Sequence, residues 1–343
     1  MVRQAQVTLD DIARKLDVSK VTVSKALRDH PDISEATKKK VRHIAKKLGY
    51  TPNFMARSLS ARCSGTLGLV VPRIAHHFFA TAIEAIYERA REDDYDVILM
   101  VSQESAERQA RNIQTLLSMR VDGLLISAAE DTSDLSPFQL LQKMGVPTVM
   151  FDRTVPGQSF SSVTVDDEEG AFKITEHAIK SGFTRLGHLA GYSNTNVGKL
   201  RRLGFQKALQ KHGLLLRREW VVEGGFSDHD GSAGLSKLCE NRELPEAIFA
   251  VTYPVALGAH SAARKRGLAI PQDLALVCFG SYYDYFSPAI IRVEQPTPLI
   301  GQKAVELLLA QIRHPNKIQR QDVVLRTRFR PGETCPRKRR AAD

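Results

Sequence analysis

Thr8–Leu27 reads TLDDIARKLDVSKVTVSKAL, and this stretch predicts two short helices separated by a tight break. Thr8 has an acid three positions later, at Asp11, which is the spacing of a capping box at the start of a helix. Apolar side chains then recur at helical spacing until Asp17, where the first helix is expected to end. Ser19 provides a second N-cap, and the pattern continues as a helix to the end of the stretch.

A third helix is expected after the first two. Ser34 is its N-cap, Gly49 is its C-cap, and apolar residues repeat between them. Three short helices with a tight break between the first two are typical of a helix-turn-helix unit, whose second helix enters the major groove of DNA. The outward residues of that second helix are Lys20, Val21, Thr22, Ser24 and Lys25.

The outward face of the predicted second helix has the chemistry of a DNA contact. Lysine donates to guanine, hydroxyls bond to bases or phosphates, and valine can pack on a thymine methyl. No acid occurs between Ser19 and Arg28, which suits a groove lined by phosphates. The alternative is the solvated surface of a small helical domain, which accounts for the helix caps but not for the missing acids.

The positive charge of the chain is concentrated at its ends. The 343 residues include 49 Lys and Arg against 38 Asp and Glu, a formal net charge of +11. Residues 1–62 hold 14 basic and 6 acidic residues, residues 326–343 hold 7 and 2, and residues 63–325 hold 28 and 30. A basic head on a nearly neutral body favours a polyanion as the partner of the head. The basic tail is expected to be solvated and disordered.

Composition excludes several classes of protein. The hydrophobic content of 43% suffices for two or three globular domains, and no run of about 18 apolar residues is present to cross a membrane. The first residues contain no apolar signal core. Four scattered cysteines (Cys63, Cys239, Cys278, Cys335) share no ligand-like spacing. We therefore expect a protein of a reducing cytoplasm, with no metal site, no cofactor and no membrane contact.

From Gly65 onward the pattern changes to apolar strands that alternate with helices. The predicted strands are 66–72, 97–101, 123–127, 148–151, 186–190, 247–251 and 274–279. The predicted helices are 78–91, 106–119, 137–144, 200–212, 230–240 and 255–266. Such alternation indicates parallel sheets covered by helices on both faces. The expected fold class is therefore multidomain, with an all-α helix-turn-helix head and an α/β body of two lobes, each a doubly wound parallel sheet.

Three segments of the head resemble the LacI/GalR (lactose-repressor) family of bacterial transcription regulators. They are Val7–Ala13, Val18–Leu27 and Leu48–Asn53. Ala56–Leu59 is similar to the family's hinge helix, and the resemblance implies that paired hinge helices of a dimer enter the minor groove, where Leu59 wedges between base pairs. The family usually has arginine where Lys25 stands, so a bidentate fork is lost and the operator sequence is expected to differ. The predicted DNA contacts are Thr8, Ser19, Lys20, Val21, Thr22, Ser24, Lys25, Asn53, Ala56, Arg57 and Leu59.

The resemblance extends to the body and implies a periplasmic-binding-protein-like sensor. Its ligand cleft is expected between two lobes, at the carboxyl ends of the strands. The matching cleft positions are Phe78, Phe79, Asp152, Arg201, Phe226, Thr252, Tyr253, Gly280 and Gln295. Arg201 is expected to hold hydroxyls or a carboxylate of the effector, and Phe226 to support its ring. The alternatives are a surface ion pair for the arginine and an ordinary core position for the phenylalanine.

The predicted cleft departs from the family pattern in three places. His76 and His77 stand where the family commonly has asparagine and proline, and Thr252 and Tyr253 replace an amide and an acid that commonly hold sugar hydroxyls. Near Gly280 an acid of the family pattern is lost, and a cluster of aromatic residues follows. A negatively charged or partly aromatic effector would suit an arginine clamp with fewer acids around it.

These observations predict four segments and one function. The segments are 1–50, a helix-turn-helix DNA-binding domain; 51–64, a hinge helix and linker; 65–330, a two-lobed effector-binding and dimerisation domain; and 331–343, a basic tail. The predicted function is a nucleoid-associated transcriptional repressor that binds a near-palindromic operator as a homodimer or a higher oligomer. A sugar or sugar-derived metabolite, such as a sugar acid, is the expected effector.

Two other functions are alternatives to a repressor. The sequence has no dinucleotide-binding fingerprint, phosphate-binding loop or hydrolase motif, so an enzyme is not expected. The alternative is a cytoplasmic small-molecule-binding protein that acts through protein contacts without binding DNA.

Overall fold

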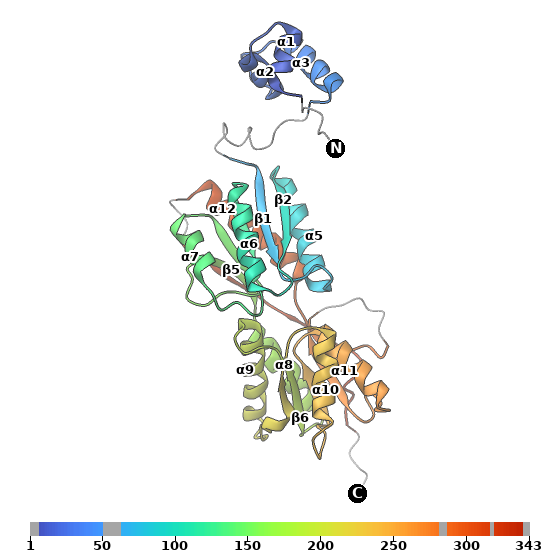
Figure 1. The fold of residues 1–343 in the computed structure, drawn as a ribbon. Helices are drawn as coiled ribbons and strands as arrows, with labels where there is room; N and C mark the ends of the chain where they lie inside the picture. The colour runs from blue at the N-terminus through green and yellow to red at the C-terminus, as the bar shows by residue number, and fades with distance from the viewer. Residues whose placement is uncertain (1–6, 51–62, 281–286, 316–318, 339–343) are drawn as a thin grey trace. The chain divides into compact units, whose positions relative to one another are not determined.

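The computed structural model describes residues 7–50, 63–280, 287–315 and 319–338. The chain divides into two compact units at the bond between Ser64 and Gly65, and each unit is described by itself (Figure 1). Residues 51–62 of the predicted hinge and linker (51–64) lie outside the described residues.

The first unit is a bundle of three helices, as the sequence predicted. They are α1 (Leu9–Leu16), α2 (Lys20–Leu27) and α3 (Glu35–Leu48). The capping box is present, with the Thr8 amide donating to Asp11 Oδ2 at 2.9 Å. Gly49 ends α3 with φ of +69°, a left-handed conformation that glycine adopts without strain. The core consists of Ile12, Ala13, Val23, Ala26, Val41 and Ala45.

The second unit contains two six-stranded sheets, one in each of two lobes. In the first lobe the strand order is β11-β5-β4-β3-β1-β2, and in the second it is β12-β10-β9-β8-β6-β7. All neighbours pair in parallel except β10 and β12. Every residue of β1 is buried, as expected of a parallel strand covered on both faces.

The strands and helices of the two lobes have the following bounds. The first lobe holds β1 (Thr66–Val71), β2 (Asp96–Val101), β3 (Gly123–Ile126), β4 (Thr148–Phe151), β5 (Ser161–Val165), β11 (Asp322–Leu325), α5 (His77–Glu92), α6 (Ala106–Ser118), α7 (Ser136–Lys143) and α12 (Thr297–Arg313). The second holds β6 (Leu186–Ala190), β7 (Val221–Glu223), β8 (Ala247–Ala250), β9 (Ala275–Phe279), β10 (Ile291–Glu294), β12 (Arg328–Arg330), α8 (Asp167–Lys180), α9 (Asn196–Lys211), α10 (Asp228–Leu238) and α11 (Tyr253–Lys265).

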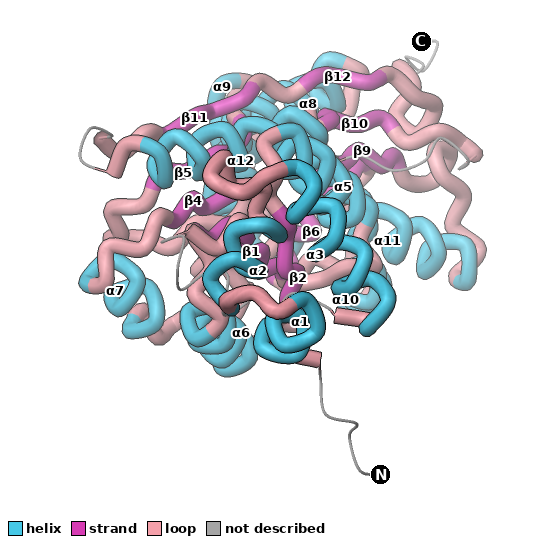
Figure 2. The backbone as a smooth tube through the Cα atoms, turned by 90° about the horizontal axis from the view of Figure 1, so that it is seen from above, coloured by secondary structure: helices cyan, strands magenta, loops and turns pink. Residues whose placement is uncertain are grey.

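The chain passes between the lobes three times, after β5, after β10 and after β11. Because of the second crossing, α12 returns to the first lobe, where it packs against α5 and against β3, β4 and β5 (Figure 2).

The sequence pattern identified neither α8 nor α12. It also placed the start of α9 at Leu200, whereas the helix begins at Asn196 because the Thr195 hydroxyl caps it by accepting from the Gly198 amide at 3.0 Å.

The prediction of a disordered basic tail from residue 331 onward is wrong for residues 331–338. Thr334 and Cys335 are buried, and the Thr334 hydroxyl donates to the carbonyl oxygen of Leu276 at 2.6 Å. Lys338, counted as part of a solvated charge run, pairs through its Nζ with Glu246 Oε1 at 2.6 Å. The segment therefore belongs to the second lobe, because its hydroxyl and ammonium groups bond to that lobe.

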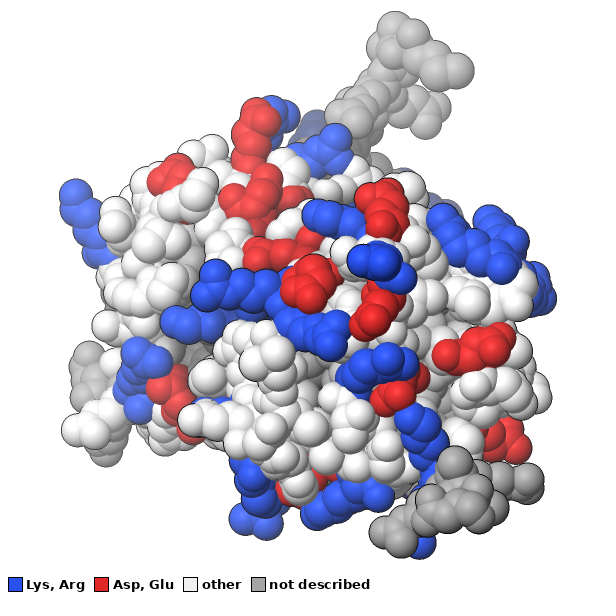
Figure 3. Space-filling view, turned by 90° about the horizontal axis from the view of Figure 1, so that it is seen from below, with Lys and Arg blue, Asp and Glu red and all other residues white. Residues whose placement is uncertain are grey.

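Charges of both signs are mixed over the face of the molecule seen in Figure 3. This agrees with the nearly equal numbers of acids and bases in residues 63–325. Within the described part of the chain, no helix combines the length and the apolar character needed to cross a bilayer.

Candidate functional site

The outward face of α2 is positioned by its N-cap. The Ser19 hydroxyl accepts from the Thr22 amide at 3.0 Å and lies 2.8 Å from the Thr22 hydroxyl. Val21 is 64% exposed, and Ser24 is half-buried beside it. Thr8 serves the capping box of α1, where its hydroxyl donates to Asp11 at 2.7 Å.

The two lysines of α2 are paired with acids from neighbouring elements. Lys20 Nζ lies 2.7 Å from Asp10 Oδ2 of α1, and Lys25 Nζ lies 2.9 Å from Asp32 Oδ2 in the turn before α3. The sequence of α2 alone does not predict these pairs, because both acids lie outside that helix. The four side chains are between 41% and 58% exposed, so a phosphate can replace either carboxylate at little cost. The other predicted DNA contacts, Asn53, Ala56, Arg57 and Leu59, lie outside the described residues.

All nine predicted effector residues line a single small cavity between the two lobes of the second unit. They follow the carboxyl ends of β1, β4, β8, β9 and β10 or lie on α9 and before α10, the edge at which such folds bind ligands. The cavity has a volume of about 30 Å³, room for roughly one water molecule. Five further residues line it that were not among the predicted effector contacts: His76, Arg153, Val197, Pro254 and Phe279.

Arg201 is held by groups of its own lobe. Its Nε donates to Asp167 Oδ1 at 2.8 Å, and its Nη1 donates to the Val251 carbonyl oxygen at 2.7 Å. Its guanidinium carbon lies 3.6 Å from the centre of the Phe279 ring. Arg201 therefore forms an ion pair with Asp167. The alternative prediction was an ion pair at the surface, but this one is buried at the wall of the cavity.

Two buried carboxyl groups accompany the arginines. Burial raises the pKa of Asp167 to about 6, although Arg201 beside it acts in the opposite direction. Burial likewise raises the pKa of Asp152, which Arg153, Arg201 and a long hydrogen bond of 3.4 Å from Gln295 Nε2 oppose. Asp152 therefore offers the cavity a carboxyl group that is not committed to a close ion pair.

Arg153 is the most important cavity residue that the sequence reasoning missed. It is buried, its Nη1 donates to Glu104 Oε2 at 2.7 Å, and its guanidinium carbon lies 4.5 Å from the centre of the Phe226 ring and 5.9 Å from that of Phe79. Asp152 at the end of a predicted strand marked the position, but nothing in the sequence showed that the next side chain also lines the cavity.

His76 contributes a neutral imidazole to the cavity. Both ring nitrogens are buried and have no hydrogen-bond partner among the described residues. Burial, together with the positive charges of Arg153 and Arg73, lowers the pKa of His76 to about 4. An unpartnered neutral ring can donate to a bound molecule through one nitrogen and accept through the other.

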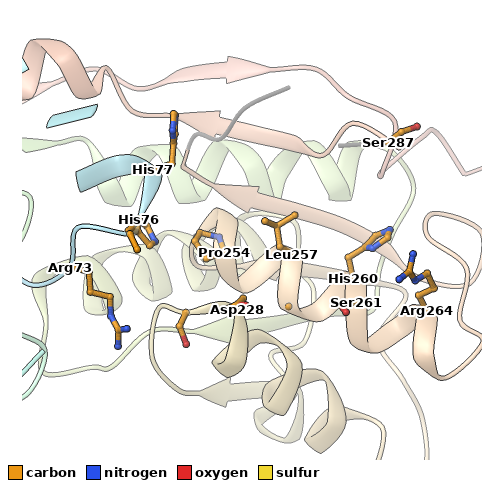
Figure 4. Close-up of a pocket in the computed structure, with 13 residues that line it drawn as sticks. Arg73, His76, His77, Asp228, Pro254, Leu257, His260, Ser261, Arg264 and Ser287 are labelled. Atoms are coloured by element: carbon orange, nitrogen blue, oxygen red, sulfur yellow. The ribbon is translucent and has the colours of Figure 1, made fainter. Parts of the chain in front are cut away.

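A wider groove of about 680 Å³ meets the cavity at His76 and Pro254, which line both. Figure 4 shows Pro254, Leu257 and Arg264 along α11 on one side of this groove, with Arg73 beyond His76. In the described segments, no group of three or more His, Cys, Asp and Glu side chains has the arrangement of a metal site.

Two asparagines of the second lobe bond directly to the backbone of the first. The Asn196 side chain accepts from the Thr154 amide at 3.1 Å and donates to the Asp152 carbonyl oxygen at 2.9 Å. Asn194 Nδ2 donates to the Glu130 carbonyl oxygen at 2.9 Å. These bonds join the two rims of the cleft on one side.

Two family models match the chain. Residues 8–53 match the model "Bacterial regulatory proteins, lacI family", and residues 175–335 match "Periplasmic binding protein-like domain". Catabolite control protein A of Priestia megaterium is 31% identical over 305 residues, which are 88% of this chain and 91% of that protein. The ribose operon repressor of Haemophilus influenzae is also 31% identical, over 90% of this chain and 93% of that protein.

Solved structures give the same result. The lac repressor dimer bound to operator and the anti-inducer ONPF matches with a TM-score of 0.83 at 24% identity, over 96% of this chain and 99% of that chain. The complex of the transcriptional regulator CelR with cellobiose matches with a TM-score of 0.73 at 27% identity, over 96% of this chain and 100% of that chain. The chain therefore belongs to the LacI family, as a transcriptional repressor with a DNA-binding helix-turn-helix domain and an effector-binding domain, and not to a family of enzymes.

Proposed function

We propose that the chain binds a near-palindromic operator as a homodimer, each head reading one half-site, and that a sugar-derived effector in the interlobe cleft switches this binding. The single observation that carries the proposal is the face of α2, where Val21, Lys20 and Lys25 are exposed. Binding exchanges the carboxylates of Asp10 and Asp32 for phosphates or base edges. The place of action is the nucleoid in the cytoplasm.

The hinge contributes a second group of DNA contacts in this proposal. Asn53, Ala56 and Arg57 lie along the minor groove, and Leu59 wedges between base pairs, which kinks the duplex and widens the contact. The lac repressor, with which the chain shares its fold, is solved as a dimer bound to operator.

The interlobe cavity is the proposed effector site. Support comes from the convergence of all nine candidate residues on one cavity and from CelR, which is solved with cellobiose. The idea of a negatively charged effector required Arg201 to offer an unmatched cation, but Asp167 pairs with it at 2.8 Å. We therefore favour a neutral sugar-derived effector, whose hydroxyls can bond to Asp152, His76 and Gln295.

The first lobe offers a surface for the second subunit. Strand β2 is at the edge of its sheet, and its residues from Val97 to Val101 are only partly buried. Tyr87 of α5 is 41% exposed, and its hydroxyl donates to the Val97 carbonyl oxygen at 2.9 Å, so the helix and the strand form one continuous face. An exposed apolar strand edge can pair with another chain.

Effector binding and operator binding are coupled through the two lobes. An effector that binds one arrangement of the lobes more tightly than another shifts the population between them. Coupling free energies of this kind amount to about 1–3 kcal/mol, a change of roughly 5- to 150-fold in operator affinity.

The test begins with selection of an operator from random duplexes by the full chain. Lys20→Ala/Lys25→Ala is expected to weaken binding to the selected duplex by more than tenfold, whereas Arg111→Ala, which removes an exposed cation paired on the sensor, is not. The logarithm of the affinity should also fall with that of salt concentration, with a slope of about −0.9 for each neutralised phosphate. Equal affinities for the double variant and the parent chain, or a flat salt response, would favour a protein that acts without DNA.

A further inference from the structure

We propose that the head carries a second DNA-binding surface on α3, which holds another segment of duplex while α2 holds the operator. This surface, the α3 face, consists of exposed basic residues on the side of the helix away from the core: Lys39, Lys40, His43, Lys46 and Lys47. The inference rests on the proposed function in one respect, because α2 has to hold the first duplex. It goes further by giving each head a second contact, made with phosphates and without reading sequence.

The side chains of the α3 face project from one side of the helix. Residues three, four or seven positions apart lie on the same side of a helix, and the five positions of this face are spaced in that way. Val41 and Ala45 lie on the opposite side and are buried in the core with Ile12 and Val23. The α3 face is therefore an outer surface of the head, about 12 Å long at the rise of a regular helix.

No carboxylate among the described residues pairs with the α3 face. Glu35 is the only acid of α3 and lies four positions before Lys39, but its Oε1 accepts from Lys38 Nζ at 2.8 Å. Asp29, in the turn before α3, pairs with Lys38 at 3.1 Å and with Arg42 at 2.8 Å. The acids nearest to the α3 face are therefore committed to bases outside it.

An ordinary solvated helix surface does not account for this arrangement. Exposed bases on helices of the sensor are balanced by an acid four positions away in several places: Arg111 with Glu107, Lys173 with Glu169, and Lys180 with Glu176. The helix dipole favours Lys46 and Lys47 in the last turn of α3, but it gives no such advantage to Lys39 and Lys40. A bound polyanion would supply the negative charge that the head itself does not place beside these lysines.

The α3 face and the outward face of α2 point in different directions. Each of the three helices packs against the other two and turns its buried residues toward the shared core, so the outer faces diverge. A straight duplex that lies along α2 therefore does not also lie along α3.

A second segment of duplex is the partner that fits the α3 face. DNA carries one negative charge for about every 1.7 Å of its axis, so several phosphates lie within reach of four lysines at once. A head that α2 holds on DNA also meets other segments of the same molecule at a high local concentration. The α3 face thus lets one head connect two segments of DNA.

Chemical footprinting of lysines in the full chain tests the proposal without any substitution. Sulfo-NHS acetate acetylates accessible amines, and mass spectrometry measures the extent at each lysine. One short operator duplex for each dimer should protect Lys20 and Lys25 alone. A random duplex added afterwards should slow acetylation of the α3 lysines by about threefold or more. Lys15, which is exposed on α1 and belongs to neither face, is the internal reference.

Protection in two steps supports the proposal. Protection of the α3 lysines by the operator alone overturns it, because both faces would then contact one duplex. Unchanged reactivity of these lysines after the random duplex is added also overturns it. The proposed function fails separately, since in that case Lys20 and Lys25 stay reactive when the operator is present.

A capture assay measures the connection between two duplexes. Beads that carry the operator are loaded with the full chain and then exposed to a labelled random duplex. The variant with the α3 lysines replaced, Lys39→Gln/Lys40→Gln/Lys46→Gln/Lys47→Gln, keeps helix propensity and should capture about tenfold less of the labelled duplex. Its affinity for the operator should stay within about threefold of the parent value, because α2 is unchanged.

The matched control removes the same number of exposed lysines from α8 and α9 of the sensor, where each is paired with an acid: Lys173→Gln/Lys180→Gln/Lys207→Gln/Lys211→Gln. It lowers the net charge equally and should capture as much random duplex as the parent chain. Any connection through the second head of a dimer is the same in both variants. Equal capture by the two variants contradicts a second DNA-binding surface on α3.

Discussion

Lys25 Nζ lies 2.9 Å from Asp32 Oδ2, so the lysine that is expected to face DNA from α2 is already paired with an acid outside that helix. The same is true of Lys20 and Asp10 at 2.7 Å. In the proposed function, operator binding is therefore an exchange of partners, in which DNA replaces the carboxylate beside each lysine.

The first prediction concerns Asp32. Asp32→Asn removes a negative charge from the DNA-facing surface and leaves Lys25 without a competing carboxylate, so operator affinity should rise by about threefold. Fluorescence anisotropy with the selected operator measures the change at two salt concentrations. Glu107→Gln, which removes an exposed acid paired with Arg111 on the sensor, should change nothing. Weaker binding by Asp32→Asn would mean that the ion pair orients the lysine instead of competing for it.

The second prediction concerns pH. Desolvation, and after it the negative charge of Glu104, raises the pKa of the half-buried Glu130 to about 7, with Arg153 opposing and Asp230 of the second lobe adding to the repulsion. Between pH 4.5 and 7 the Glu130 carboxyl is therefore protonated in the folded chain and ionised in the unfolded chain. Its contribution to the free energy of unfolding falls as the pH rises through that window.

Glu130→Gln isolates that contribution. The variant and the parent chain should be equally stable near pH 4.5, and the variant should be more stable near pH 8 by about 1 kcal/mol, a value reduced for solvent screening. Urea unfolding at a series of pH values gives the difference curve, in which contributions from Asp152 and Asp167 cancel. A difference that does not vary with pH contradicts the assignment.

Much of the fold could be predicted because strands such as Ala275–Phe279 are buried on both faces. Such a strand is a continuous apolar run, which is visible in the sequence without knowledge of the strands beside it. The missed helices are of another kind. α12 covers strands that precede it by well over a hundred residues, and no local pattern says which sheet a helix will cover after the chain crosses between lobes. The tail failed as a prediction for the same reason, since the partners of Thr334 and Lys338 are distant in sequence.

For the site, the positions of the residues could be predicted but their contacts could not. Similarity to a family located nine cavity residues, but it assigned them no partners. Arg201 was identified without Asp167, and Asp152 without its neighbour Arg153. Asp152 adopts a φ of 58° at the end of β4, and the side chains of both Asp152 and Arg153 line the cavity. No local sequence pattern predicts this left-handed residue or the inward position of its neighbour.

The third prediction concerns the bonds between the lobes. Asn196→Ala removes the acceptor of the Thr154 amide and the donor to the Asp152 carbonyl oxygen, so the rims of the cleft should separate more often. Hydrogen exchange at the Thr154 amide should accelerate by about tenfold, since that amide loses its partner. Ser193→Ala is the control, because Ser193 bonds to Glu223 within the second lobe. Unchanged exchange at Thr154 would show that other contacts hold the cleft.

The last prediction concerns the packing that places Phe226 at the cavity. Gly258 of α11 lies so close to α10 that an added Cβ would stand 1.8 Å from the Asp228 carbonyl oxygen. Gly258→Ala must push α10 and α11 apart, and we expect it to destabilise the sensor by about 3 kcal/mol or more in urea unfolding. Because α10 begins two residues after Phe226, the shift should also move this ring away from Arg153. Gly145→Ala meets no atom within 4 Å and carries only the strain of a φ of +65°, about 1 kcal/mol. Equal losses for the two variants would contradict close packing of the helices as the cause.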